Sequence, residues 1–182
     1  MEKVKIMVSS TQDDLQAERD AAQEVIEKLG HKCLRSETHP CFGESPCNVC
    51  LEMAKTCHIY IGIFGKRYGF VPEGEEISIT ELEYRRAREH HPSKILVYIK
   101  EEEEYEDAQA NFLEEVQNFK MGYFRRPKFK SAEELKPQIR ADVRYWICMK
   151  IAESFDKDKK IQILTAENAY LNEALEVYKR TT

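Results

Sequence analysis

The segment Ile59–Phe64 is the most continuously apolar part of the sequence, and it constrains the fold more than any other feature. A strand with one face in water alternates apolar and polar residues, and this segment does not alternate. It therefore predicts a central strand of a parallel sheet that helices cover on both faces. Gly65 and Gly69 follow it and predict a loop at the carboxyl end of the strand.

Strand-like and helical segments alternate on either side of this strand. Strands are predicted at residues 4–10, 32–36, 58–64 and 95–99, with a weak edge strand at 123–129 that contains Pro127. Helices are predicted at residues 14–29, 47–56, 78–90 and 109–120, and from Ser131 onward. This alternation predicts an α/β domain over residues 1–156, with a parallel sheet of about five strands.

Polar residues that cap backbone amides mark three of the helix starts. Thr11 or Asp13 is expected to cap the first helix, and Ser45 followed by a proline is expected to begin the second. Ser78 and Glu81 fit a capping box, in which the glutamate returns to the amide of the serine. The pattern predicts a helix that begins just after Ser78.

Residues 157–182 form a separate predicted element, a helix with a short heptad pattern. Two readings stay open: the helix associates with a second copy or a partner protein, or it folds onto its own subunit. The apolar positions alternate by three and four, with one asparagine among them: Ile161, Leu164, Asn168, Leu171, Leu175 and Tyr178.

Composition excludes several classes of protein. The 182 residues carry a net charge of -5, which argues against a general DNA- or RNA-binding protein. No apolar run reaches the roughly 18 residues that span a membrane. The first residues enter a strand directly, without the apolar segment of a signal peptide, so a cytoplasmic location is expected.

The six cysteines allow one alternative reading, a metal site. Cys47 and Cys50 have the spacing of metal ligands, and a zinc knuckle could include Cys41 and His39. However, Cys50 also falls in an apolar helical pattern, where a cysteine acts as a small hydrophobic residue. Because no second Cys-x-x-Cys pair exists in the sequence, the expectation is that no metal is bound.

Two carboxylates at the start of the predicted helix 78–90 are candidates for catalysis. Glu81 has a capping role, so it is the weaker candidate. Glu83 lies roughly 200° further round the helix and has no such role. Ala87, one turn later, leaves room beside Glu83 for a ligand or for close packing on the sheet. Spacing alone therefore leaves both readings of Glu83 open, a catalytic carboxylate or a packed structural residue.

Polar residues at the carboxyl ends of two strands predict a ligand site at that edge of the sheet. Ser9, Ser10 and Thr11 follow the first strand and are expected either to bind a phosphate or ribose or to cap a helix. The remaining candidates for ligand binding lie after the central strand and at the start of helix 78–90: Phe64, Gly65, Arg67, Tyr68 and Ser78.

Three ordered motifs resemble one known family. They are Val8-Ser9-Ser10-Thr11 with Asp14-Leu15 and Glu18-Arg19-Asp20; Cys50-Leu51-Glu52 with Cys57–Gly65 and Arg67-Tyr68-Gly69; and Ser78-Ile79-Thr80-Glu81-Leu82-Glu83-Tyr84. Over residues 3–150 the sequence resembles the domain-of-unknown-function family numbered 4062, often found at the amino end of STAND-type and NLR-like NTPases. That family is similar to TIR domains and to nucleoside 2-deoxyribosyltransferases, and the resemblance implies a flavodoxin-like three-layer fold.

The resemblance also implies an activity. In those relatives, a glutamate at the start of the corresponding helix acts on the N-glycosidic bond of NAD or a nucleoside. The deoxyribosyltransferase pattern, a glutamate four residues before an alanine, falls on Glu83 and Ala87. Two features of the relatives are missing: the acidic residues expected around Phe64–Gly69 and the Trp-Cys start of many TIR catalytic helices.

Two functions are therefore predicted. The first is a TIR-like domain that binds a nucleotide and cleaves the N-glycosidic bond of NAD or a nucleoside with Glu83. The second is a non-catalytic signalling or assembly module that acts through protein–protein association, including self-association through residues 161–178. Neither function requires a resident cofactor.

Overall fold

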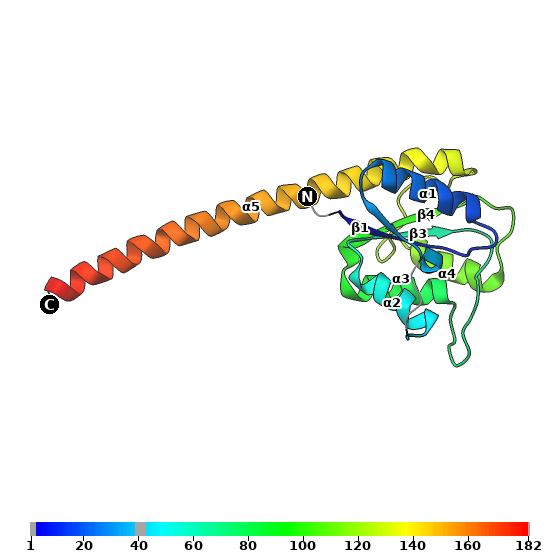
Figure 1. Cartoon of the computed structure of the whole chain (residues 1–182), viewed down its shortest axis with the longest axis horizontal. Coiled ribbons are helices and arrows are strands. Elements are labelled where there is room, and N and C mark those ends of the chain that lie inside the picture. The colour runs from blue at the N-terminus through cyan, green and yellow to red at the C-terminus, as the bar shows by residue number, and fades with distance from the viewer. Residues whose placement is uncertain (1–2, 39–42, 182) are drawn as a thin grey trace. The chain divides into compact units, whose positions relative to one another are not determined.

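The computed structural model describes residues 3–38 and 43–181, and side chains as far as Asn168 (Figure 1). The strands are β1 (Lys5–Ser9), β2 (Lys32–Leu34), β3 (Ile59–Phe64) and β4 (Ile95–Ile99). The α-helices are α1 (Gln16–Lys28), α2 (Pro46–Thr56), α3 (Ile79–His90), α4 (Asp107–Gln117) and α5 (Ala132–Thr181), and the short 3₁₀ helices are η1 (Ser36–Thr38) and η2 (Pro92–Lys94).

The four strands form one parallel sheet in the order β2-β1-β3-β4. This confirms the α/β class and is consistent with a flavodoxin-like sandwich. The prediction of about five strands is wrong for the described residues, where the segment beside β4 makes only isolated parallel bridges, at Phe124 and Phe129. Pro127 lies between these two bridges, and because proline has no backbone N–H, a continuous ladder cannot form there.

Helices cover both faces of the sheet. On one face, α2, α3 and α4 enclose a core that includes Met53, Tyr84 and Phe112. On the other face lies α1, whose buried residues include Val25 and Ile26, and Figure 1 shows α1 and α3 on opposite sides of the strands. Every residue of β3 is buried, as its unbroken apolar sequence predicts. The three-layer arrangement brings the carboxyl ends of β1 and β3 to the same edge of the molecule.

The helix ends agree with the sequence in most places. Ser45 and Ser78 are N-caps, and their hydroxyls accept hydrogen bonds from backbone amides three residues later. Gly30 ends α1 with a φ of 82°, a conformation that glycine adopts without strain. The expected cap by Thr11 or Asp13 is wrong, because α1 begins later, with Leu15 at the N-cap position. Leu15 is fully buried, so packing fixes this helix start.

A buried lysine joins two elements of the core. Lys94, just before β4, is 2% exposed. Its Nζ donates hydrogen bonds of 2.7 Å to the carbonyl of Ala54, 2.8 Å to that of Lys55 and 3.3 Å to that of Cys57. These carbonyls lie at the end of α2, where a helix carries unpaired acceptors and a partial negative charge. Lys94 therefore caps α2 from another part of the chain.

Helix α5 is continuous, so the charged segment 156–160 lies within a helix. Its first residues belong to a compact unit, Met1–Asp142, and the remainder to a second unit, Val143–Thr182. In the second unit the large apolar side chains of Phe155, Ile161 and Leu164 are exposed. Within the described ranges, no helix combines the length and hydropathy needed to cross a membrane.

Candidate active site

A cleft of about 720 Å³ opens at the carboxyl ends of β1 and β3. This is where the sheet order reverses direction, the usual position of a ligand site in an open α/β sheet. Six parts of the α/β domain contribute the side chains that the argument below uses: Ser9, Ser10 and Thr11 at and after the end of β1, Arg19 on α1, Ser36 and Glu37 after β2, Cys47 and Cys50 on α2, Arg67 and Phe70 after β3, and Thr80 and Glu83 on α3.

Glu83 lies at the buried side of the cleft. It is 6% exposed, and its carboxyl accepts a short hydrogen bond from the hydroxyl of Ser9. The thiol of Cys50 on α2 lies close to the carboxyl and is a second group that favours its ionised form. Burial raises the pKa of Glu83 to about 7, although both groups act in the opposite direction. Near neutral pH, Glu83 is therefore able both to hold and to release a proton.

A tyrosine on β3 completes the surroundings of this carboxyl. Tyr60 is fully buried near Ser9 and Glu83, and its hydroxyl lacks a hydrogen-bond partner among the described residues. Burial and the nearby charge of Glu83 raise the pKa of Tyr60 well above its usual value, so the phenol stays neutral. The carboxyl of Glu83 is thus held by Ser9 on β1, with Tyr60 on β3 close by.

Glu81 lies outside the cleft, as the helical periodicity predicts for a residue two positions away. Its carboxylate accepts a 2.6 Å hydrogen bond from the hydroxyl of Tyr68 and forms a 2.6 Å ion pair with Arg85. The predicted hydrogen bond from the amide of Ser78 to this carboxylate is therefore wrong, because the carboxylate binds Tyr68 and Arg85 instead. The serine half of the capping box is present, with the amide of Glu81 donating to Ser78.

The structure separates the other predicted ligand-binding residues into two groups. Ser9, Ser10, Thr11 and Arg67 line the cleft, and Arg67 forms a 2.7 Å ion pair with Asp13. The Oγ1 atom of Thr11 is buried and lacks a hydrogen-bond partner in the described part of the chain.

The second group does not line the cleft. Phe64 packs in the core against Phe112, and the carbonyl of Gly65 accepts a hydrogen bond from Gln109. Ser78 is buried as the cap of α3, and Tyr68 binds Glu81. At the end of β3 and in the loop after it, Phe64, Gly65 and Tyr68 are thus outside the cleft, whereas Arg67, Gly69 and Phe70 line it.

A second carboxylate in the cleft was not apparent from the sequence. One Nη atom of Arg19 donates to both oxygens of Glu37, at 2.6 and 2.7 Å, and Arg35 also pairs with Glu37. Burial would raise the pKa of Glu37, but the hydrogen bonds and charge of Arg19 and Arg35 lower it to about 2. Glu37 is therefore ionised at every pH of interest.

Besides Asp13, which pairs with Arg67, the cleft thus holds Glu83 near its titration point and Glu37 in its charged form. Such a pair is typical of sites that carry out acid–base or electrostatic catalysis, although structural ion pairs also shift pKa values. The sequence signal for Glu37 was weak, since a single glutamate after a short strand has many ordinary explanations. Its relation to Glu83 depends on β2 and β3 flanking β1, which no local pattern reveals.

The cysteines do not form a recognisable metal centre among the described residues. Cys47 and Cys50 line the cleft, and burial raises the pKa of Cys50 to about 12. No group of three or more His, Cys, Asp or Glu side chains within residues 3–38 and 43–181 is placed to hold a metal ion. Cys41 and His39, the other candidates for a zinc knuckle, lie outside the described residues.

Comparison with known proteins gives one result. No curated protein matches the sequence. A family model described as a domain of unknown function (DUF4062) matches residues 5–144, which are 140 of the 182 residues and extend from β1 into α5. The matched region contains the whole sheet and every side chain of the cleft. The chain therefore belongs to the DUF4062 family of domains of unknown function.

Proposed function

We propose that this chain is a TIR-like domain that binds NAD, a nucleoside or a nucleotide in the cleft and cleaves its N-glycosidic bond. The observation that carries the proposal is the position of Glu83, which is buried at the carboxyl edge of a parallel sheet in contact with an open cleft. A pKa of about 7 gives this carboxyl a protonation state that suits chemistry at neutral pH.

The reaction breaks the bond between the anomeric carbon of the sugar and a nitrogen of the base. The base leaves with the bonding electron pair, while positive charge develops on the sugar. Nicotinamide leaves NAD already neutral, whereas the base of a nucleoside takes up a proton from water. The ionised carboxylate of Glu83 stabilises that charge or attacks the anomeric carbon, and a water molecule then supplies the hydroxyl of the product. Ser9 positions Glu83, because its hydroxyl donates directly to the carboxyl.

The experiment that tests this function is incubation of the purified chain with NAD and with a panel of nucleosides and nucleotides. Free base, followed by chromatography, is expected to appear with at least one compound and to increase linearly with protein concentration. If a compound raises the melting temperature of the chain but releases no base, the result would support nucleotide binding and contradict cleavage. No release and no binding across the panel would contradict the proposal as a whole.

One observation favours a second role, assembly through the helical extension. Ile161 and Leu164, the first two positions of the heptad pattern, are 60% and 49% exposed. Exposed apolar side chains at this spacing are typical of a helix that pairs with another helix. We therefore propose self-association through residues 161–178 as an alternative or additional property of the chain.

Leu164→Ser in the full chain is expected to lower the mass measured by sedimentation if this pairing occurs. Ile163→Ser is the matched control, because Ile163 is 51% exposed and lies one position away from the heptad pattern. Equal masses for the wild type and Leu164→Ser, across a range of concentrations, would contradict self-association through this helix.

A further inference from the structure

Glu37 lines the same cleft as Glu83, and its position indicates which sugar the ligand contains. We propose that Glu37 and Ser36 bind the vicinal hydroxyls of a ribose, so that the cleft prefers ribosyl over 2′-deoxyribosyl compounds. This inference rests on the proposed function, which supplies the nucleotide class of ligand, and it identifies the sugar that the same site recognises.

The geometry begins with the connection between Glu37 and the catalytic edge. Arg19 is 1% exposed, and its Nη1 donates to the hydroxyl of Ser10 at 2.9 Å while its Nη2 donates to Glu37. A single guanidinium therefore joins Ser10 to Glu37. Ser10 is adjacent to Ser9, which binds Glu83. The two carboxyl groups accordingly line one cleft, separated by a short chain of hydrogen-bonded side chains.

The two oxygens of Glu37 differ in the strength of their partners. Oε1 accepts from both Arg19 and Arg35, at 2.7 Å each. Oε2 accepts from Arg19 and, at 3.1 Å, from the exposed hydroxyl of Ser36. The arginine bonds are charge-assisted and buried on the arginine side. The hydroxyl of Ser36 is neutral, and it also accepts a 3.2 Å hydrogen bond from the side-chain amide of Gln12. A ligand hydroxyl can therefore replace Ser36 at Oε2 without breaking an ion pair.

A vicinal diol fits this arrangement better than a single hydroxyl. One sugar hydroxyl donates to Oε2 of Glu37, and the other bonds to the displaced Ser36 hydroxyl, which is both donor and acceptor. Ser36 and Glu37 also line the cleft that contains Glu83. A sugar held by its hydroxyls at this side presents its anomeric carbon toward the side of Ser9 and Glu83.

Charge explains why the carboxylate suits a hydroxyl rather than a phosphate. Glu37 is ionised, because Arg19 and Arg35 lower its pKa to about 2 despite its burial. An ionised carboxylate only accepts hydrogen bonds, so it attracts O–H donors and repels an anion. A hydrogen bond to a charged group contributes roughly 1.5–3 kcal/mol, which corresponds to about a 10- to 100-fold difference in affinity.

The test compares the four common ribonucleosides with their 2′-deoxy counterparts, using calorimetric binding and chromatographic release of base. The wild type is expected to bind at least one ribonucleoside about 10-fold or more tightly than its 2′-deoxy form. Glu37→Gln is expected to bring this ratio of affinities close to one, mainly because it weakens the binding of the ribonucleoside. Ser36→Ala is expected to lower the ratio by a smaller factor.

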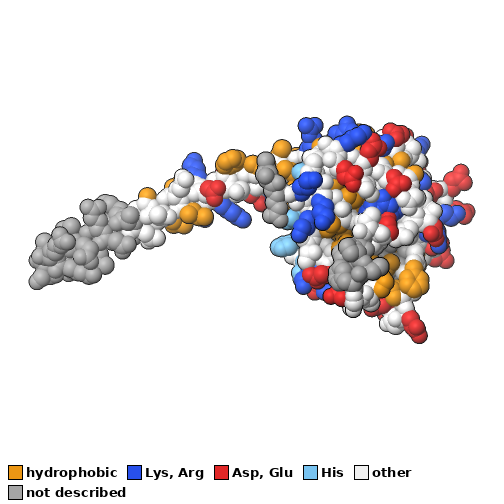
Figure 2. Space-filling view, in the orientation of Figure 1, with side chains coloured by type: hydrophobic (Ala, Val, Ile, Leu, Met, Phe, Trp, Pro, Cys, Tyr) orange, Lys and Arg blue, Asp and Glu red, His pale blue; other side chains and the backbone are white. Residues whose placement is uncertain are grey.

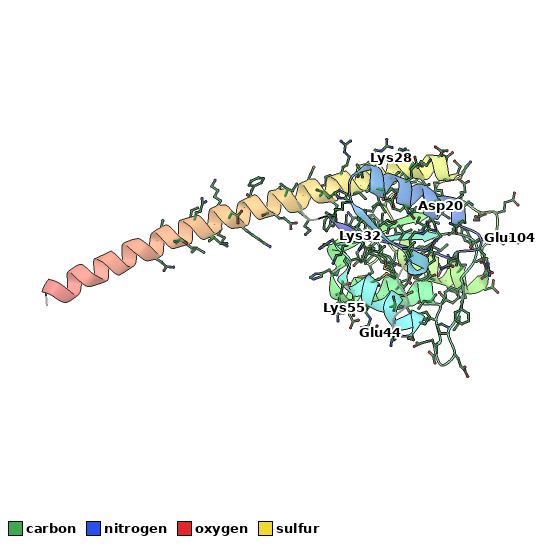
Figure 3. All side chains as sticks on the ribbon, in the orientation of Figure 1. Asp20, Lys28, Lys32, Glu44, Lys55 and Glu104 are labelled. Carbon is green, nitrogen blue, oxygen red and sulfur yellow. The ribbon has the colours of Figure 1, made fainter. Side chains whose placement is uncertain are left out.

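Asp20→Asn is the matched control. Asp20 pairs with the same Arg35 at 2.7 Å, but its side chain is 59% exposed and does not line the cleft (labelled in Figure 3). The Asp20→Asn substitution perturbs the same ion-pair network as Glu37→Gln, but the variant is expected to keep the preference for ribose. A stable Asp20→Asn protein that loses the preference would overturn the assignment to Glu37.

The comparison of ribonucleosides with their 2′-deoxy forms on the wild-type chain tests the inference even if Glu37→Gln does not fold. Equal binding of ribosyl and deoxyribosyl compounds would overturn it, and release of base from both would leave the proposed function intact. A ribose preference without release of base would support the inference and contradict cleavage. Absence of binding by every nucleoside would overturn the inference, while the proposed function would then depend on the results with NAD and the nucleotides.

Discussion

Glu83→Gln is expected to lower the rate of base release by roughly 10³-fold, with little change in ligand affinity. Glutamine has the shape of glutamate and keeps a carbonyl that accepts from Ser9, so the cleft retains its form. It carries no negative charge, however, and therefore cannot stabilise the cationic sugar or form a bond to it. The measurement is the rate of base release at saturating concentration of the compound that the panel identifies.

Glu81→Gln is the control on the same helix. Glu81 binds Tyr68 and Arg85 outside the cleft, so its loss is expected to leave the rate of base release nearly unchanged. A comparable fall in the rate of base release in both variants would indicate that the loss comes from damage to α3. The assignment of Glu83 as the catalytic carboxylate would then be wrong.

The same Glu83→Gln variant is expected to be more stable than the wild type at alkaline pH. The pKa of Glu83 is about 7 in the folded chain, against about 4.3 in an unfolded one. As pH rises between these values, the unfolded chain releases this proton first, so the wild type loses stability. Glutamine avoids this loss, which approaches about 4 kcal/mol above pH 7.

Urea unfolding of both proteins at pH 4 and pH 8 measures this difference. The gain from glutamine is expected at pH 8 and is expected to be small at pH 4, where Glu83 is neutral in the folded chain and mostly neutral in the unfolded one. A difference that is independent of pH would contradict the raised pKa. Loss of activity with a gain in stability is typical of a residue kept for function.

Lys94→Met is expected to destabilise the fold by about 2–4 kcal/mol. Methionine fills a similar volume but leaves the carbonyls of Ala54, Lys55 and Cys57 without their donor in a buried position. The end of α2 also loses the positive charge that balances its partial negative charge. The measurement is the shift of the urea midpoint at an unchanged slope.

Lys55→Met is the matched control for this prediction. Lys55 lies at the end of the same helix, labelled in Figure 3, but its side chain is 45% exposed and pairs loosely with Glu52 at 3.5 Å. Its replacement is expected to change stability by less than about 0.5 kcal/mol. Similar effects of both substitutions would show that Lys94 contributes no more than a surface charge.

Local patterns predicted the framework of the site because they depend on residues close in sequence. The unbroken apolar segment identified β3, and the helical turn of about 100° per residue separated Glu83 from Glu81. Ser9 was predicted as well, because a polar residue at the end of a strand in a parallel sheet faces the ligand edge. Acidic and basic side chains are interspersed over the face shown in Figure 2, as the mixed composition indicates.

Features that depend on packing between distant segments were not predictable. Arg19 resembles a surface residue of an amphipathic helix, yet it is buried against Ser10 and Glu37 because β2 lies beside β1. Tyr68 was assigned to the ligand, but its hydroxyl reaches Glu81 on the other side of α3. The isolated bridges on either side of Pro127 show why a fifth strand was predicted but does not form. The apolar residues of this segment suit a strand, but proline lacks the backbone N–H that a continuous ladder needs.

The hydrogen bond between Ser9 and Glu83 joins residues 74 positions apart, and this has a consequence for folding. β1 is synthesised before β3 and α3, so Ser9 can meet Glu83 only after β3 and the start of α3 have emerged. Contacts of such long sequence separation form late and slowly, because the intervening chain must first lose its conformational freedom. Partly folded chains therefore lack the site, and a ligand that binds there recognises and stabilises only molecules that have completed folding.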